Sequence, residues 1–191
     1  MISANRLASV IHGLRVLLRL DVDYVEHFER TYDGFVRSFL PALILAPLHF
    51  AHIALAYGKQ DMLPHVGVYA ITEVIAYVMT WTLFPLVMIY VARLLHREER
   101  YFAYMVPYNW FQLPLGLVVL PLTIIGDLEL IATEAFSFLS LLVLGVLLTY
   151  TTFLARTGLR VSTATAFGLV VLDIVLNLLG GQMIERIQSP G

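Results

Sequence analysis

Apolar residues in this chain gather into five long runs, which short polar stretches separate. A membrane helix needs about 20 mainly apolar residues to cross roughly 30 Å of hydrocarbon, and each run is long enough. The runs are continuously apolar rather than alternating, which favours helices over the strands of a membrane β-barrel. The pattern therefore predicts an all-α, polytopic five-helix bundle. Its predicted spans are residues 35–57, 66–94, 101–125, 130–154 and 162–179.

The connections between the runs are short, so helices that are neighbours in sequence are expected to pack side by side. Residues 35–181 then form the membrane domain, and residues 182–191 form a short external tail. Two glycines inside runs, Gly116 and Gly145, are expected to permit close helix approach. Gly180 and Gly181 are expected to end the fifth helix.

The first 34 residues follow a different pattern. Apolar residues between Leu7 and Leu18 recur at helical spacing, with Arg15 and Arg19 on the opposite face. This predicts an amphipathic helix in the cytoplasmic membrane interface, with its arginines near anionic lipid. A signal peptide is disfavoured, because arginines interrupt the apolar run and no small-residue cleavage site follows. The acidic stretch 21–33 is either the solvated face of a second cytoplasmic helix or a docking surface for a basic partner.

Composition agrees with a membrane protein, since 59% of the residues are hydrophobic, 14% are charged and the mean hydropathy is +0.81. Soluble domains carry about 25% charged residues, so the apolar surplus is expected to face lipid. A net charge of −2 without basic blocks argues against a nucleic-acid partner. The chain has no cysteine, which excludes thiol catalysis, disulfides and cysteine metal sites.

Basic residues predict the orientation, because Lys and Arg accumulate on the cytoplasmic flanks of membrane helices. Of the 12 basic residues, only Lys59 and Arg186 fall at one end of the predicted bundle. The other ten fall at the opposite end, so we expect a cytoplasmic N-terminus and an external C-terminus in a bacterial-type inner membrane. The ten are Arg6, Arg15, Arg19, Arg30, Arg37, Arg93, Arg97, Arg100, Arg156 and Arg160.

Ionisable residues inside membrane helices are costly and are therefore candidates for function. Five polar residues fall at similar estimated depths on spans one, two and five. They admit three interpretations: hydrogen bonds that hold helices together, a proton or ligand pathway, or a divalent metal site. We favour the first and expect no metal or other cofactor. The five are His49, His52, Glu73, Asp173 and Asn177.

Span three carries a second polar pair, Asn109 and Gln112, between Pro107 and Pro114. Their amides either satisfy carbonyls that the prolines leave unpaired or line a substrate cavity in a broken helix. The chain contains no nucleophile elbow, phosphate-binding glycine loop or zinc-protease motif. No catalytic residue is therefore assigned.

Two segments carry a resemblance to a known family: the aromatic start of span three, YFAYMVPYNWFQLP, and the basic turn ARTGLRVSTATAFGL between spans four and five. With five spans, a cytoplasmic N-terminal segment and a short external tail, the chain resembles the Ypt-interacting-protein (YIP) family and its prokaryotic branch over residues 35–181. The resemblance implies a five-span fold and a membrane-organising role.

The expected function is therefore that of a non-enzymatic membrane scaffold or interaction protein, which organises lipid or serves as a subunit of a membrane assembly. Its expected partners are membrane lipids and either another protein or a second copy of the chain. The alternative is a small proton- or cation-linked transporter or channel subunit that uses the intramembrane His, Glu and Asp residues.

Overall fold

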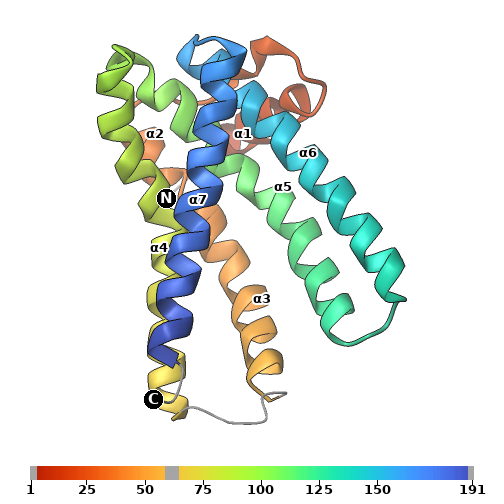
Figure 1. Cartoon of the computed structure of the whole chain (residues 1–191). Coiled ribbons are helices and arrows are strands. Elements are labelled where there is room, and N and C mark those ends of the chain that lie inside the picture. The colour runs from red at the N-terminus through yellow and green to blue at the C-terminus, as the bar shows by residue number, and fades with distance from the viewer. Residues whose placement is uncertain (1–3, 59–64, 189–191) are drawn as a thin grey trace.

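The computed structural model describes residues 4–58 and 65–188, and within these ranges the chain is all-α, with helices and loops but no strand (Figure 1). Five helical segments are long and apolar enough to cross a membrane, which confirms the predicted multi-pass architecture. The elements are α1 (Ala4–Leu17), the 3₁₀ helix η1 (Val22–His27), α2 (Tyr32–Arg37), α3 (Leu40–Tyr57), α4 (Val66–Leu94), the 3₁₀ helix η2 (Glu98–Arg100), α5 (Tyr101–Asp127), α6 (Thr133–Leu159) and α7 (Thr163–Gln188).

The first predicted span is divided into α2 and α3 by a break at Ser38 and Phe39. Thr31 caps α2, since its hydroxyl accepts a hydrogen bond of 3.1 Å from the Gly34 N–H. Pro41 stands in the first turn of α3. A proline is tolerated there because the backbone N–H groups of the first turn have no carbonyl partner within the helix. Inside one continuous helix the same proline would remove one backbone hydrogen bond, and its ring would clash with the carbonyl of the preceding turn.

The last two helices both extend beyond the predicted ends of spans four and five. Helix α6 ends at Leu159, and Arg160 follows in the left-handed conformation with φ 54°. Helix α7 continues through Gly180 and Gly181 to Gln188, so the expectation that these glycines end it is wrong. A helical glycine costs only about 1 kcal/mol relative to alanine, whereas backbone groups left unpaired in hydrocarbon cost several.

Packing departs from simple sequence order. Helices α5, α6 and α7 do pack against their sequence neighbours, but α3 packs mainly on α5 and α4 mainly on α7. Toward the lower end of the view, the α5–α6 hairpin leans away from α4 and α7 (Figure 1). Gly116 permits the close α3–α5 contact, because a Cβ there would lie 2.5 Å from Leu45 Cδ1. The same expectation for Gly145 is wrong, since no atom lies within 4 Å of a Cβ built there.

The N-terminal segment is part of the core rather than a separate layer. Leu17 and Tyr24 are fully buried, in a cluster with the first half of α5 and the end of α6. The hydroxyl groups of Tyr24 and Thr157 are 2.7 Å apart, and Tyr150 donates a 2.7 Å hydrogen bond to the Leu18 carbonyl. One edge of α1 is thus docked on protein.

The other edge of α1 stays open, because Leu7, Ile11 and Leu18 are 42%, 45% and 48% exposed. These side chains remain available to lipid, so the interfacial placement of α1 stands as a prediction for this edge alone. The acidic stretch 21–33 does not form one helix: it contains the six-residue η1, which Asp21 caps by accepting a hydrogen bond from the Asp23 N–H, and the start of α2.

Candidate functional site

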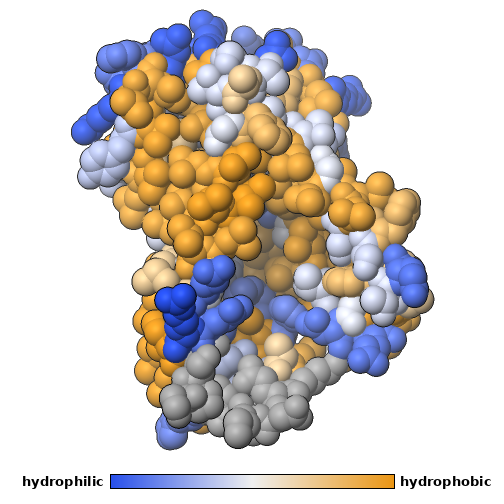
Figure 2. Space-filling view, viewed as in Figure 1, coloured by the Kyte–Doolittle hydropathy of each residue, from blue (hydrophilic) through white to orange (hydrophobic). Residues whose placement is uncertain are grey.

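A cavity of about 530 Å³ lies between the α5–α6 hairpin, α3 and the α4–α7 pair. Figure 2 shows the molecule hollowed in this region, with hydrophilic side chains around the hollow. Most other lining residues are apolar, and they include Leu45, Leu115 and Leu147. The wall also holds five of the seven polar residues that the sequence singled out, namely His49, Asn109, Gln112, Asp173 and Asn177.

Asp173 is the only carboxylate in this wall and lies near the middle of α7. The Tyr108 hydroxyl on α5 donates a 2.5 Å hydrogen bond to Asp173 Oδ2. Asn177, one helical turn along α7, donates to Asp173 Oδ1 at 2.9 Å and to its backbone carbonyl at 2.9 Å. The carboxylate is thus held on one side by a hydroxyl and on the other by an amide. The Asp173–Asn177 pair follows from helical spacing.

Tyr108 is a residue of the candidate site that sequence reasoning missed, as are Tyr77 and Trp81. Tyr108 is buried in α5 and reaches across to α7. The available signal was a tyrosine deep inside an apolar span, because a buried phenol usually needs a hydrogen-bond partner. The sequence alone did not indicate which helix would supply that partner.

Aromatic side chains form most of the α4 part of the wall. Tyr77 and Trp81 line the cavity from α4, and their ring centroids are 6.3 Å apart. The Tyr77 hydroxyl donates a 2.5 Å hydrogen bond to the Ala42 carbonyl, which holds the ring against α3. The His49 ring lies on Tyr77 at 4.6 Å with an interplanar angle of 32°.

His49 carries an unsatisfied group. Its Nε2 is buried and has no hydrogen-bond partner among the described residues. A buried polar atom without a partner costs about 1–3 kcal/mol, so such an atom in a cavity wall indicates a position where a ligand or water can bind.

His52 and Glu73 do not line this cavity. His52 Nε2 is 2.7 Å from Asp127 Oδ2, which joins the end of α3 to the end of α5. Glu73 is on α4, which runs antiparallel to α7, and Met79 is the α4 side chain beside Gly180. Extending this register separates Glu73 from the level of Asp173 by more than about 15 Å of helix rise. The two carboxylates therefore lie at different depths.

Asn109 has a structural partner. It is 1% exposed, and its Nδ2 donates a 2.9 Å hydrogen bond to Ser38 Oγ at the break between α2 and α3. Ser38 Oγ in turn donates to the Phe35 carbonyl at 2.7 Å. Asn109 therefore joins α5 to the broken span, an interhelical bond of the kind worth about 0.6–2 kcal/mol.

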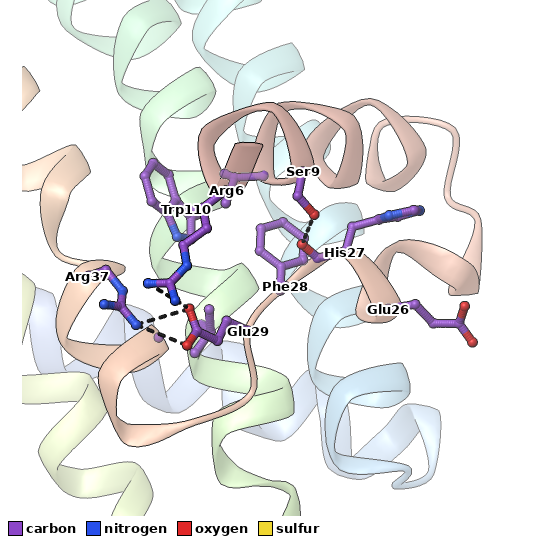
Figure 3. A pocket seen from close by; sticks show the side chains of 11 residues that line it. Arg6, Ser9, Glu26, His27, Phe28, Glu29, Arg37 and Trp110 are labelled. Atoms are coloured by element: carbon purple, nitrogen blue, oxygen red, sulfur yellow. Dashed lines mark hydrogen bonds and ion pairs between the residues drawn. The ribbon is translucent and has the colours of Figure 1, made fainter. Parts of the chain in front are cut away.

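A second pocket, of about 320 Å³, lies beneath α1 (Figure 3). Glu29 accepts two 3.0 Å hydrogen bonds from Arg37 Nη2 and also lies 4.0 Å from Arg6 Nη1. Ser9 donates a 2.8 Å hydrogen bond to the His27 carbonyl and holds α1 on η1. Part of the acidic stretch is thus engaged within the N-terminal segment, which leaves little free charge in this pocket for a ligand.

Within residues 4–58 and 65–188 there is no group of three or more His, Cys, Asp or Glu side chains that could hold a metal ion. No protein-family model matches the chain, and no curated protein or solved structure matches it. The YIP-like assignment stays a prediction from the sequence.

Proposed function

We propose that this chain is a non-enzymatic membrane protein that binds lipid or another amphiphile in its central cavity and so organises the surrounding membrane. The observation that carries the proposal is the cavity itself, which is mostly apolar and lies between helices that diverge along the membrane-spanning direction. Its volume of about 530 Å³ is in the range of small-molecule pockets, about 300–1,000 Å³.

The shape of the wall supports an amphiphile rather than a fully polar ligand. Along α5 the wall runs from Tyr108 to Leu120, a helix rise of about 18 Å. Several polar side chains, including Gln112 and Asn177, lie in the half of the wall that holds Asp173. The stretch from Leu115 to Leu120 offers mainly hydrocarbon, with His49 on α3 as a polar neighbour. A molecule with one polar end and one apolar end matches this distribution.

The same proposal includes a cytoplasmic N-terminus, an external C-terminus and a bacterial-type inner membrane. The support is the segregation of basic residues, ten of which fall at the end that carries α1 and η1, whereas Arg186 is the one at the other end among the described residues. Lys59, the other basic residue predicted for that end, lies outside the described residues. A YIP-like membrane-organising role, with a protein partner or a second copy, fits this architecture.

The test is to purify the protein in lipid nanodiscs, transfer it to mild non-ionic detergent and identify the retained molecules by mass spectrometry. Val119 lines the cavity, and its neighbour Val118 is 55% exposed on the outside of α5. Val119→Trp should fill the cavity and release the retained amphiphile, whereas Val118→Trp should keep it. Equal retention by both variants would contradict binding in the cavity.

Proton- or cation-linked transport is the second candidate, and the specific observation in its favour is a carboxylate near the middle of a membrane helix inside a cavity. In proteoliposomes, a flux driven by a pH gradient and lost in Asp173→Asn would favour transport. No flux above that of empty vesicles would leave amphiphile binding as the function.

A further inference from the structure

The described lining of the central cavity holds a carboxylate without a basic side chain to pair with it. Among residues 4–58 and 65–188, its lining includes Asp173 and His49 but no lysine or arginine. Both side-chain hydrogen bonds to Asp173 are donated to its oxygens, one by Tyr108 and one by Asn177. An ionised carboxylate is an acceptor on both oxygens, so this arrangement suits the negatively charged form. A negative charge surrounded by hydrocarbon favours a cationic partner, and the described protein supplies none in this wall.

The rings around the cavity favour an organic cation over a bare metal ion. Tyr77, Trp81 and Tyr108 all line it, and the faces of such rings attract ammonium groups. A metal ion would need several carboxylate or imidazole ligands together, and no group of three exists among the described residues. One carboxylate with several aromatic rings is instead a suitable environment for an alkylammonium group.

A second polar position lies further along the cavity. His49 packs on Tyr77, whereas Asp173 is bonded to Tyr108, whose ring contacts Phe84 at 5.1 Å. Tyr77 and Phe84 are seven residues apart on α4, about 10 Å of helix rise, so the two polar groups lie at different depths. His49 Nε2 is buried without a partner among the described residues, so the His49 ring would have to turn toward the cavity before it could bind a second polar group of an elongated ligand.

The geometry points to a cationic amphiphile as the ligand class: an alkylammonium compound whose charged nitrogen lies at Asp173, which Tyr108 contacts, and whose hydrocarbon chain passes the other aromatic rings and follows α5 toward Leu120. This inference rests on the proposed function, because it specifies which amphiphile the cavity selects. It does not require transport.

Tryptophan fluorescence provides a direct measurement. The chain has 2 Trp residues, and Trp110→Phe leaves Trp81, in the cavity wall, as the only one. In nanodiscs of uncharged lipid, this variant is titrated with 10-bromodecylamine and with its neutral counterpart 10-bromodecanol, because bromine quenches nearby indole fluorescence. Val119→Phe blocks the cavity, and Val118→Phe is the matched lipid-facing control.

We expect saturable quenching by both probes, and we expect the amine to bind at least about tenfold more tightly than the alcohol. Asp173→Asn should remove this preference for the amine, whereas Asp173→Glu should keep it. Thr80 also lines the cavity, so Thr80→Lys should remove the preference by supplying a competing cation, even if Asp173→Asn fails to fold. A preference below tenfold, or one that survives Thr80→Lys, overturns the cationic ligand while leaving amphiphile binding intact. Absence of saturable quenching by either probe, or quenching unchanged in Val119→Phe, overturns the proposed function as well.

Discussion

Gly158 lies at a close approach of α6 to the backbone of α5. A Cβ at this position would lie 2.8 Å from Tyr104 Cα and 3.2 Å from the Ala103 carbonyl oxygen. Both atoms belong to the backbone of the buried half of α5, so neither can rotate away. The Gly158 carbonyl also accepts a 2.7 Å hydrogen bond from Arg100 Nε. Gly158→Ala must therefore push the last turn of α6 away from the first turn of α5.

The net effect is the difference between opposing contributions. Alanine is the better helix former by about 1 kcal/mol, which stabilises the variant. Overpacking a tight contact costs about 1–3 kcal/mol, and weakening the Arg100 hydrogen bond adds about 1 kcal/mol. We expect Gly158→Ala to lower the free energy of unfolding by about 1–3 kcal/mol. Gly145→Ala is the matched control on the same helix, since its Cβ meets nothing within 4 Å. The control should gain up to about 1 kcal/mol.

The assay is SDS-induced unfolding in mixed micelles, followed by circular dichroism, with both variants compared with the parent protein. The two free energies of unfolding should differ by about 1–4 kcal/mol. If Gly158→Ala is as stable as Gly145→Ala, the close backbone contact between α5 and α6 is wrong.

Three further predictions concern the N-terminal segment and the orientation. Leu17→Ala should lower the free energy of unfolding by about 2–5 kcal/mol in the same assay, because this side chain is fully buried. Leu18→Ala is the control and should change the free energy of unfolding by less than about 1 kcal/mol. Equal effects of the two variants would contradict the docking of α1. Burial raises the pKa of Tyr24 from 10.0 to about 12, so the neutral phenol stabilises the fold fully below pH 10, and this stabilisation is lost as the pH rises from 10 to about 12. Unfolding measured across this interval should therefore show a smaller loss of stability in Tyr24→Phe than in the parent protein, and identical losses would refute the assignment. A periplasm-active reporter fused after Gly191 should be active and one fused before Met1 inactive, and the reverse pattern would invert the proposed topology.

Much of the membrane architecture follows from the sequence alone, because the length of an apolar run is a local property. Val66–Leu94 is helix α4 with the predicted bounds, and α5 extends the predicted third span by only two residues, to Asp127. The pairing of Asp173 with Asn177 is also local, since residues four apart share a helix face. The break at Ser38 and the continuation through Gly180 were not predicted, because they depend on how much each backbone interruption costs in its surroundings.

Only the tertiary structure decided which polar groups meet. The hydrophobic pattern placed His49, His52, Glu73, Asp173 and Asn177 at similar depths, but depth along separate helices does not determine their packing register or rotation. In the folded chain the antiparallel packing of α4 on α7 carries Glu73 away from Asp173, and the contact of α3 with α5 directs His52 to Asp127. The packing of α5 near α7 brings Tyr108, which no sequence spacing connects with Asp173, to that carboxylate. Spans can be predicted from composition because lipid acts on each helix separately, whereas the cavity arises from contacts among five helices at once.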